Sequence, residues 1–125
     1  MDLQVRVIDR KGGVFLVTPV GRIDSTTAVT MEKEIGAVLL RRPRCLVLDM
    51  DGVDYISSMG IRSIIQAKKK LGNIGAILRV VNLQPPVKKV FEIIRALPDE
   101  DIFGSVEEMD RYLDVMQKKV IEEGE

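Results

Sequence analysis

The amino-acid sequence predicts an α/β fold with one mixed sheet of about four to five strands, an opening β-hairpin and about four helices. Three observations predict it. Two strand-like segments at the start flank a glycine-containing turn, and later strand-like segments alternate with segments of helical periodicity. The run 45–48 is apolar at every position, as expected of a central strand that helices cover on both faces.

The first half of the chain predicts the hairpin, one helix and the central strand. In order, these elements are a strand over 3–8, a turn at 11–13, a strand over 14–20, a helix over 26–41 and a strand over 45–48. The hairpin follows from alternating apolar residues on either side of Gly12 and Gly13, and Pro43 ends the helix. Helical spacing predicts that the helix buries Val29, Met31, Ile35, Val38 and Leu39.

The second half predicts two further strand-like segments and three helices. In order, these are a helix over 59–71, a strand over 76–81, a helix over 85–96, a short strand at 102–103 and a last helix from Ser105 to about residue 122. Ser105 and Glu108 match a capping box. The predicted buried stripes are Ile61, Ile64, Ile65 and Leu71, then Val87, Val90, Phe91 and Ile94, then Val106, Met109, Leu113, Met116 and Val120. Residues 117–125 are expected to be the solvated end of this helix, followed by a short solvated tail after about residue 122.

Composition narrows the function classes. Lys and Arg together number 19, as do Asp and Glu, so the sequence predicts neither nucleic-acid binding nor membrane binding. The chain contains no histidine, the commonest general base and metal ligand. Cys45, its one cysteine, is expected to be a buried apolar residue. No secretion signal or long apolar run is present, so we expect a cytoplasmic protein with residues 1–125 forming a single domain.

The segment after the central strand concentrates polar side chains. The run from Leu46 through Asp49 and Asp51 resembles the opening motif of haloacid-dehalogenase-type phosphotransferases, in which the first Asp is a nucleophile and Mg²⁺ is bound nearby. Such an enzyme also needs a Ser or Thr, a Lys and an acidic pair from later strands, which this short chain has little room to supply. We therefore expect the carboxylates, Asp54 included, to serve turns, and we predict no catalytic, metal or cofactor site.

Two serines precede the helix predicted over 59–71. Either Ser57 or Ser58 can act as its N-cap by accepting hydrogen bonds from free N–H groups of the first turn. The same position suits a phosphate, because a helix N-terminus combines a positive partial charge with free N–H donors. Met59 is either an exposed contact for a partner or core filler.

From Val14 to about Val106 the chain resembles the STAS domain of bacterial anti-sigma-factor antagonists. Gly21-Arg22-Ile23-Asp24 is similar to the family's Gly-x-Leu-Asp, and Ser57-Ser58-Met59-Gly60-Ile61 is similar to its Asp-Ser-Ser/Thr-Gly-Leu signature. In that family the serine after the signature Asp is phosphorylated by an anti-sigma factor that is also a serine kinase, and a PP2C-type phosphatase reverses the reaction. The resemblance places the phosphorylated residue at Ser58, with Ser57 as the alternative.

The resemblance implies a regulatory binding protein rather than an enzyme. The unphosphorylated form would bind the anti-sigma factor and release the sigma factor, through a surface formed by Asp24, Ser57, Ser58, Met59, Gly60 and Arg62. Asp24 is equally well explained as a helix cap. Ser57 replaces the signature Asp and Met59 replaces the second hydroxyl residue. This departure keeps open a second function, a non-phosphorylated STAS scaffold or ligand-binding module.

Overall fold

The computed structural model describes residues 3–123. In chain order the elements are β1 (Gln4–Asp9), β2 (Val14–Ile23), α1 (Thr27–Leu39), β3 (Cys45–Asp49), β4 (Gly52–Ile56), α2 (Ser58–Asn73), β5 (Ile77–Val81), α3 (Pro85–Ile94), a 3₁₀ turn (Asp99–Asp101), β6 (Ile102–Phe103) and α4 (Val106–Glu123). The predicted α/β class, the opening hairpin and all four predicted helices are confirmed.

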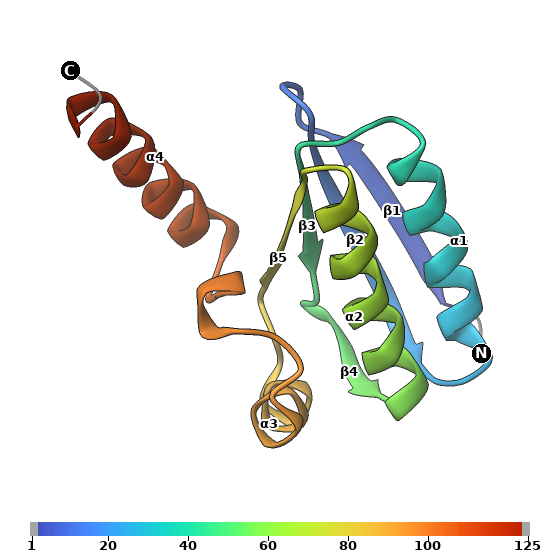
Figure 1. Ribbon diagram of the computed structural model, residues 1–125. Coiled ribbons are helices and arrows are strands. Elements are labelled where there is room, and N and C mark those ends of the chain that lie inside the picture. Colours follow the sequence, from blue (N-terminus) through green and yellow to red (C-terminus); the bar gives the residue numbers. More distant parts are fainter. Residues whose placement is uncertain (1–2, 124–125) are drawn as a thin grey trace.

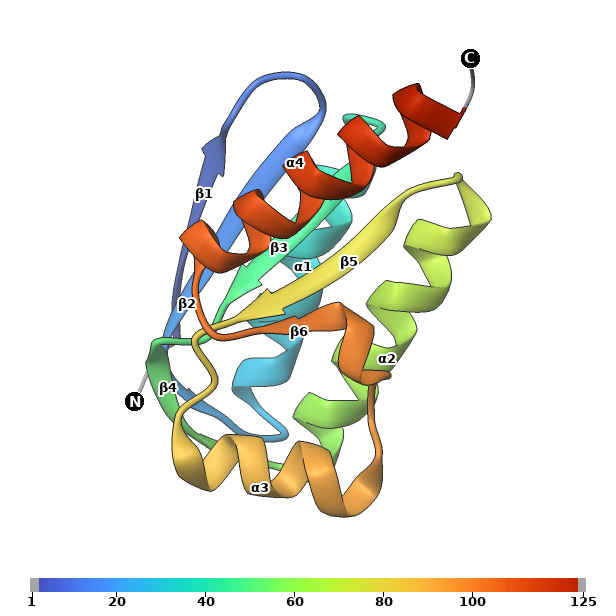
Figure 2. The same cartoon turned by 90° about the vertical axis from the view of Figure 1, so that its left-hand side faces the viewer.

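The six strands of the described region form one mixed sheet in the order β1-β2-β3-β5-β6, with β4 paired to β2 off this path. β1 is antiparallel to β2, and the other pairs are parallel. Helices α1 and α2 cover one face of the sheet, α4 crosses the other, and α3 lies at the end of the sheet (Figures 1 and 2).

Strand β4 was not predicted, because its sequence was interpreted as part of a polar loop. The first half of β2 pairs with β3, and its second half pairs with β4 after a register shift between Gly21 and Arg22. Val53 and Ile56 of β4 are buried, whereas Asp54 and Tyr55 are exposed. Two exposed residues side by side break the strict alternation by which a strand is recognised in sequence.

The sheet separates two hydrophobic clusters. The larger one lies under α1, α2 and α3, and includes Val17, Leu48 and Ile64. The smaller one lies on the α4 face and consists of Cys45, Val47, Val81, Phe103 and Met109. Cys45 is buried as predicted, and its burial raises the pKa of the thiol. Its position under α4 makes it a reporter for that face of the sheet.

Three residues predicted to be buried are exposed. Val29 is 63% exposed because it points away from the stripe of Met31, Ile35 and Val38 that packs on the sheet. Ile65 is 38% exposed, since Ile61, Ile64 and Leu71 define the centre of the buried stripe of α2. Ile94 is 50% exposed because α3 ends there and the next residue adopts a left-handed conformation.

Ser105 binds the start of the last helix as predicted, whereas the returning hydrogen bond of the predicted capping box differs, because Glu108 binds the N–H of Gly104 and not that of Ser105. The Ser105 hydroxyl accepts a hydrogen bond from the Glu108 N–H at 3.1 Å, and the Glu108 carboxylate accepts one from the Gly104 N–H at 3.0 Å. Met109 is buried and Val106 is half-buried, as predicted. The predicted contacts of Leu113, Met116 and Val120, and the predicted solvated residues 117–125, lie outside the side chains that the structure describes.

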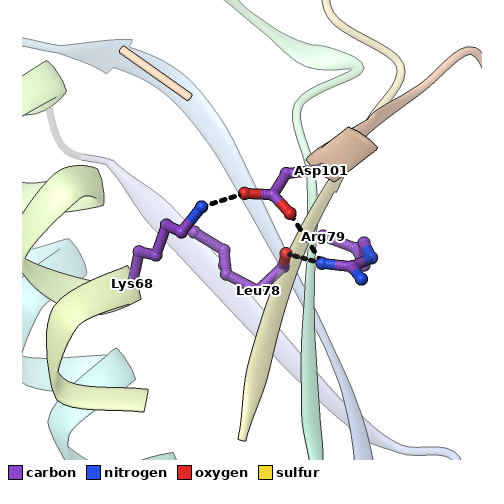
Figure 3. Close-up of polar contacts among 4 residues, drawn as sticks. All are labelled: Lys68, Leu78, Arg79 and Asp101. Atoms are coloured by element: carbon purple, nitrogen blue, oxygen red, sulfur yellow. Dashed lines mark hydrogen bonds and ion pairs between the residues drawn. The ribbon is translucent and has the colours of Figure 1, made fainter. Parts of the chain in front are cut away.

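A buried ion cluster ties α2 to the C-terminal part of the sheet. Asp101, only 4% exposed, binds the ammonium group of Lys68 on α2 and the guanidinium group of Arg79 on β5, the latter at 2.7 Å (Figure 3). Arg79 also donates to the Leu78 carbonyl at 2.9 Å. The Asp101 carboxylate, directly before β6, thus connects this part of the chain to α2 and to β5.

Candidate functional site

Ser57 is the N-cap of α2. Its N–H donates to the carbonyl of Ile23 at 2.7 Å, which fixes the end of β4 beside the end of β2. Its backbone is extended, with φ −87° and ψ 170°, and its hydroxyl accepts a hydrogen bond from the Gly60 N–H at 3.3 Å. The sequence left the cap open between two serines, and the structure assigns it to Ser57.

Ser58 is the first residue of α2, and its side chain is exposed. The N–H groups of a first helical turn have no partner inside the helix, and together they carry a positive partial charge. Ser58 therefore presents a free hydroxyl at a position where an added anion is electrostatically favoured. The two neighbouring serines differ in role, since the Ser57 hydroxyl caps α2 and the Ser58 side chain faces solvent.

Gly60 allows α2 to start directly against the two strands. A Cβ atom at Gly60 would lie 2.6 Å from Ile23 Cγ2 and 2.7 Å from Ile56 Cγ1, much closer than such atoms approach one another. The glycine of the signature is thus needed for close packing. Its backbone N–H also completes the cap with Ser57.

Asp24 lies two residues before Thr26, the N-cap position of the neighbouring helix α1, and its carboxylate binds the start of that helix. Its Oδ1 accepts from the N–H groups of Thr26 and Thr27, each at 2.9 Å. Both hydrogen bonds lower the pKa of Asp24, and the one from the Thr27 N–H has the larger effect. Because Ile23 pairs with Ile56 in the sheet, Asp24 and Ser57 follow at the same edge. These hydrogen bonds support the expected role of Asp24 at the start of α1, although the N-cap position itself is Thr26, and the contact of Asp24 with a partner stays a prediction.

Met59 and Arg62 extend this surface along α2. Met59 is 42% exposed, so it is not core filler, and Arg62 is also exposed. Sequence reasoning missed a further pair at this end of the sheet. The Arg22 guanidinium lies 4.1 Å from the ring centre of Tyr55, which faces it across β2 and β4. Recognising β4 would have revealed this pair.

The carboxylates that resemble a phosphotransferase motif stabilise a turn. Asp49 Oδ1 accepts from the Asp51 N–H at 3.1 Å and from the Asn82 side-chain amide at 3.0 Å. The Gln84 side chain donates to the Asp51 carbonyl. Among the side chains that the structure describes, no group of three or more Cys, Asp or Glu is placed to hold a metal ion. The hydrogen bonds support the expected turn role of Asp49.

Comparison with known proteins agrees with this geometry. The protein BtrV of Bordetella bronchiseptica, a candidate anti-sigma factor antagonist, is 34% identical over 86 residues, which cover 69% of this chain and 74% of BtrV. The crystal structure of an anti-sigma factor antagonist from Mycobacterium paratuberculosis superposes with a TM-score of 0.73 at 27% identity, covering 84% of this chain and 88% of that one.

A more distant structure shares the fold alone. The Bacillus cell fate determinant SpoIIAA, in its phosphorylated form, superposes with a TM-score of 0.69 at 13% identity, covering 87% of this chain and 99% of SpoIIAA. Within the part of the chain that the structure describes, no helix is long and apolar enough to span a membrane.

The model of the STAS domain family matches residues 6–109. The chain therefore belongs to the STAS domain family.

Proposed function

We propose that this chain is an anti-sigma-factor antagonist whose binding is switched off by phosphorylation of Ser58. The observation that carries the proposal is the division of roles between the two serines. Ser57 uses its hydroxyl to cap α2, whereas Ser58 stands exposed at the first position of that helix. Only Ser58 can accept a phosphoryl group without loss of the cap.

The fold tolerates a phosphate at this position. A phosphoserine carries about −1.5 to −2 charges at pH 7. At the first position of α2 this charge faces the positive end of the helix and its free N–H groups. Phosphorylation therefore adds a favourable local interaction and leaves the structure of the chain intact.

A docked partner would not tolerate the same group. Burying a dianion in an interface without matching cations costs several kcal/mol because the phosphate loses its hydration. A difference of about 5.5 kcal/mol moves a two-state equilibrium from 1:99 to 99:1. One phosphate on Ser58 is therefore sufficient to convert a formed complex into a dissociated one.

The replacement of the signature Asp by Ser57 changes charge and leaves the geometry of the helix start in place. Asp and Ser are both preferred N-caps, and Ser57 makes the capping hydrogen bond to Gly60. The kinase that acts on this chain must then recognise Ser58 without an adjacent carboxylate at position 57. The replacement therefore changes which kinases can recognise Ser58.

In this proposal residues 1–125 form a single STAS domain that works in the cytoplasm, where it meets two partner proteins. They are a kinase-type anti-sigma factor, which binds the unphosphorylated chain and phosphorylates it, and a PP2C-type phosphatase, which restores it. BtrV and the M. paratuberculosis protein support the antagonist role through their similarity to this chain.

Phosphorylation by a kinase-type anti-sigma factor from the source genome tests the proposal. With ATP present, we expect the mass of the chain to rise by one phosphate. The Ser58→Ala variant should stay unmodified, and Ser57→Ala should be modified. Titration calorimetry should then show binding by the unphosphorylated chain alone. Modification of Ser58→Ala, or equal affinity of both forms, would refute the switch.

A cavity favours one alternative, a ligand-binding STAS module. Its volume is about 840 Å³, within the usual range of ligand pockets. It lies between α3 and the segment that follows, and its lining includes Lys88, Phe91, Arg95 and Ile102. Metabolite extracts passed over the immobilised chain, with Lys88→Ala at an exposed position of the cavity lining as the comparison variant, test this alternative. Retention of one compound by the wild type and not by the variant would support it.

A further inference from the structure

The charges of this neutral chain are segregated along its length. Residues 1–57 contain eight Lys or Arg and eight Asp or Glu, a net charge of 0. Residues 58–95 contain eight Lys or Arg and one Glu, a net charge of +7, and residues 96–125 contain three Lys or Arg and ten Asp or Glu, a net charge of −7. The zero total therefore conceals a strongly basic middle segment that begins at Ser58.

The basic segment includes α2, which begins at Ser58, and α3, which lies at the end of the sheet (Figure 2). Its exposed cations are Arg62, Lys69, Lys70, Lys88, Lys89 and Arg95. None of them forms an ion pair with a side chain that the structure describes. Their charges are thus available to an external partner.

Exposed apolar side chains are interspersed among the cations of α2. Met59 is 42% exposed and Ile65 is 38% exposed, and they alternate along the helix with Arg62 and Lys69. Apolar side chains flanked by charged ones are the usual composition of a protein interface, with an apolar centre and a polar rim. We call the residues Ser58, Met59, Arg62, Ile65 and Lys69 the α2 stripe.

Arg62 stands one helical turn after Ser58 on this stripe. Both are exposed, and residues four apart in a helix have Cβ atoms about 5–6 Å from each other. A guanidinium group forms strong, often bidentate, hydrogen bonds with a phosphate. A phosphate on Ser58 therefore finds Arg62 within reach on the same helix.

We propose that the α2 stripe docks on an acidic surface of the partner protein, and that Arg62 exchanges between a partner carboxylate and the phosphate of Ser58. In the unphosphorylated chain Arg62 pairs with the partner. In the phosphorylated chain Arg62 pairs with its own phosphate, which removes the cation from the interface and sets an anion against acidic partner groups. This inference rests on the proposed function and names the chemistry of its partner.

Titration of the phosphate tests the Arg62 contact without any partner. The chain is prepared with phosphoserine at position 58, and the second ionisation of the phosphate is followed by phosphorus NMR. Because the guanidinium group of Arg62 favours the dianionic phosphate as a helix ion pair does, Arg62→Gln should raise this pKa by about 0.3. Arg111→Gln, an exposed arginine on α4, should leave it unchanged. Equal values for wild type and Arg62→Gln would overturn the contact.

Affinity for the kinase-type anti-sigma factor tests the docking surface. We expect Arg62→Glu to weaken binding by more than about tenfold and to reduce its dependence on salt, because like charges then meet at the interface. Arg111→Glu makes the same change of charge outside the stripe and should bind as the wild type does. Unchanged or tighter binding by Arg62→Glu would overturn the inference. Absence of any binding by the wild type would instead refute the proposed function.

A second copy of the chain is the competing occupant, since its C-terminal segment is acidic. Light scattering at rising concentration distinguishes the two. A monomer at low salt supports the external partner. Self-association that disappears in Arg62→Glu and persists in Arg111→Glu would overturn the inference, because the acidic surface would then belong to this chain.

Discussion

At the residue scale, the Asp24 carboxylate binds the start of α1 at the same edge of the sheet at which α2 begins with Ser58. Two backbone N–H groups at the start of α1 donate to the same carboxylate oxygen. The residue follows Ile23, whose carbonyl accepts from the N–H of Ser57. The start of α1 and the start of α2 are thus held side by side through Ile23, the last residue of β2, and Asp24, which follows it.

The lowered pKa of Asp24 predicts a stability that depends on pH. The charged carboxylate is favoured in the folded state, so its contribution is present above the ordinary pKa and is lost as the pH falls through the lowered one. We expect the wild type to melt at a higher temperature than Asp24→Asn at pH 7, and the gap between the two melting temperatures to narrow as the pH falls through the lowered pKa of Asp24. Asp54→Asn, at an exposed position of β4, serves as the control.

Gly60 provides a prediction about packing. Gly60→Ala forces a Cβ against Ile23 and Ile56, and overpacking of this kind costs about 1–3 kcal/mol. The matched control is Gly72→Ala in the same helix, where a Cβ meets nothing within 4 Å. This second variant should be stabilised by up to about 1 kcal/mol through helix propensity. Urea denaturation measures both changes, and equal effects would contradict the steric argument.

At the scale of elements, the C-terminal segment is attached to the sheet by few contacts. β6 pairs with β5 over two residues, Val80 with Ile102 and Val81 with Phe103. The Asp101 cluster, the apolar contacts of α4 and the ion pair between Asp110 and Arg10 add to this attachment. The segment therefore depends more on individual side chains than the hydrogen-bonded centre of the sheet does.

Removal of the buried Asp101 carboxylate should lower the free energy of unfolding more than removal of the more exposed Asp110 carboxylate does. Asp101→Asn leaves Lys68 and Arg79 without their anion, and we expect a loss of about 2–3 kcal/mol in the free energy of unfolding. The control is Asp110→Asn, whose partner Arg10 is partly exposed, with an expected loss below about 1 kcal/mol. A loss in Asp101→Asn no larger than in the control would contradict the structural role of the cluster.

At the scale of the whole molecule, two hydrophobic clusters lie on opposite faces of one sheet. Cys45 belongs to the smaller cluster, together with Met109 of α4. Its burial and raised pKa predict slow reaction with thiol reagents in the native state. Labelling of Cys45 therefore measures how often α4 opens from the sheet.

Opening of α4 should be separable from unfolding of the main core. A Met→Ala change in a core costs about 2–5 kcal/mol, and about 1.4 kcal/mol corresponds to a factor of ten. We expect Met109→Ala to accelerate Cys45 labelling by at least about tenfold. Ile64→Ala weakens the larger cluster and should accelerate labelling less at equal loss of global stability. Equal acceleration would mean that both clusters open together.

Some of the candidate site could be predicted because it depends on local chemistry. Serine before an apolar helical stripe predicts a capped helix start, and the capping box at Ser105 predicts the start of α4. The choice between Ser57 and Ser58 could not be made in this way. Both residues are good caps, and the choice depends on where β4 ends against Ile23, a contact between segments far apart in the chain.

The sequence by itself determined the α/β class, the order of the four helices and the resemblance to the STAS domain, because periodicity, caps and signature residues are encoded within short segments. Only the tertiary structure decided that Val29, Ile65 and Ile94 are exposed, that β4 pairs with the second half of β2, and that Asp101 joins Lys68 to Arg79. These features depend on which face of each element meets another element, and that is fixed by packing across the whole chain.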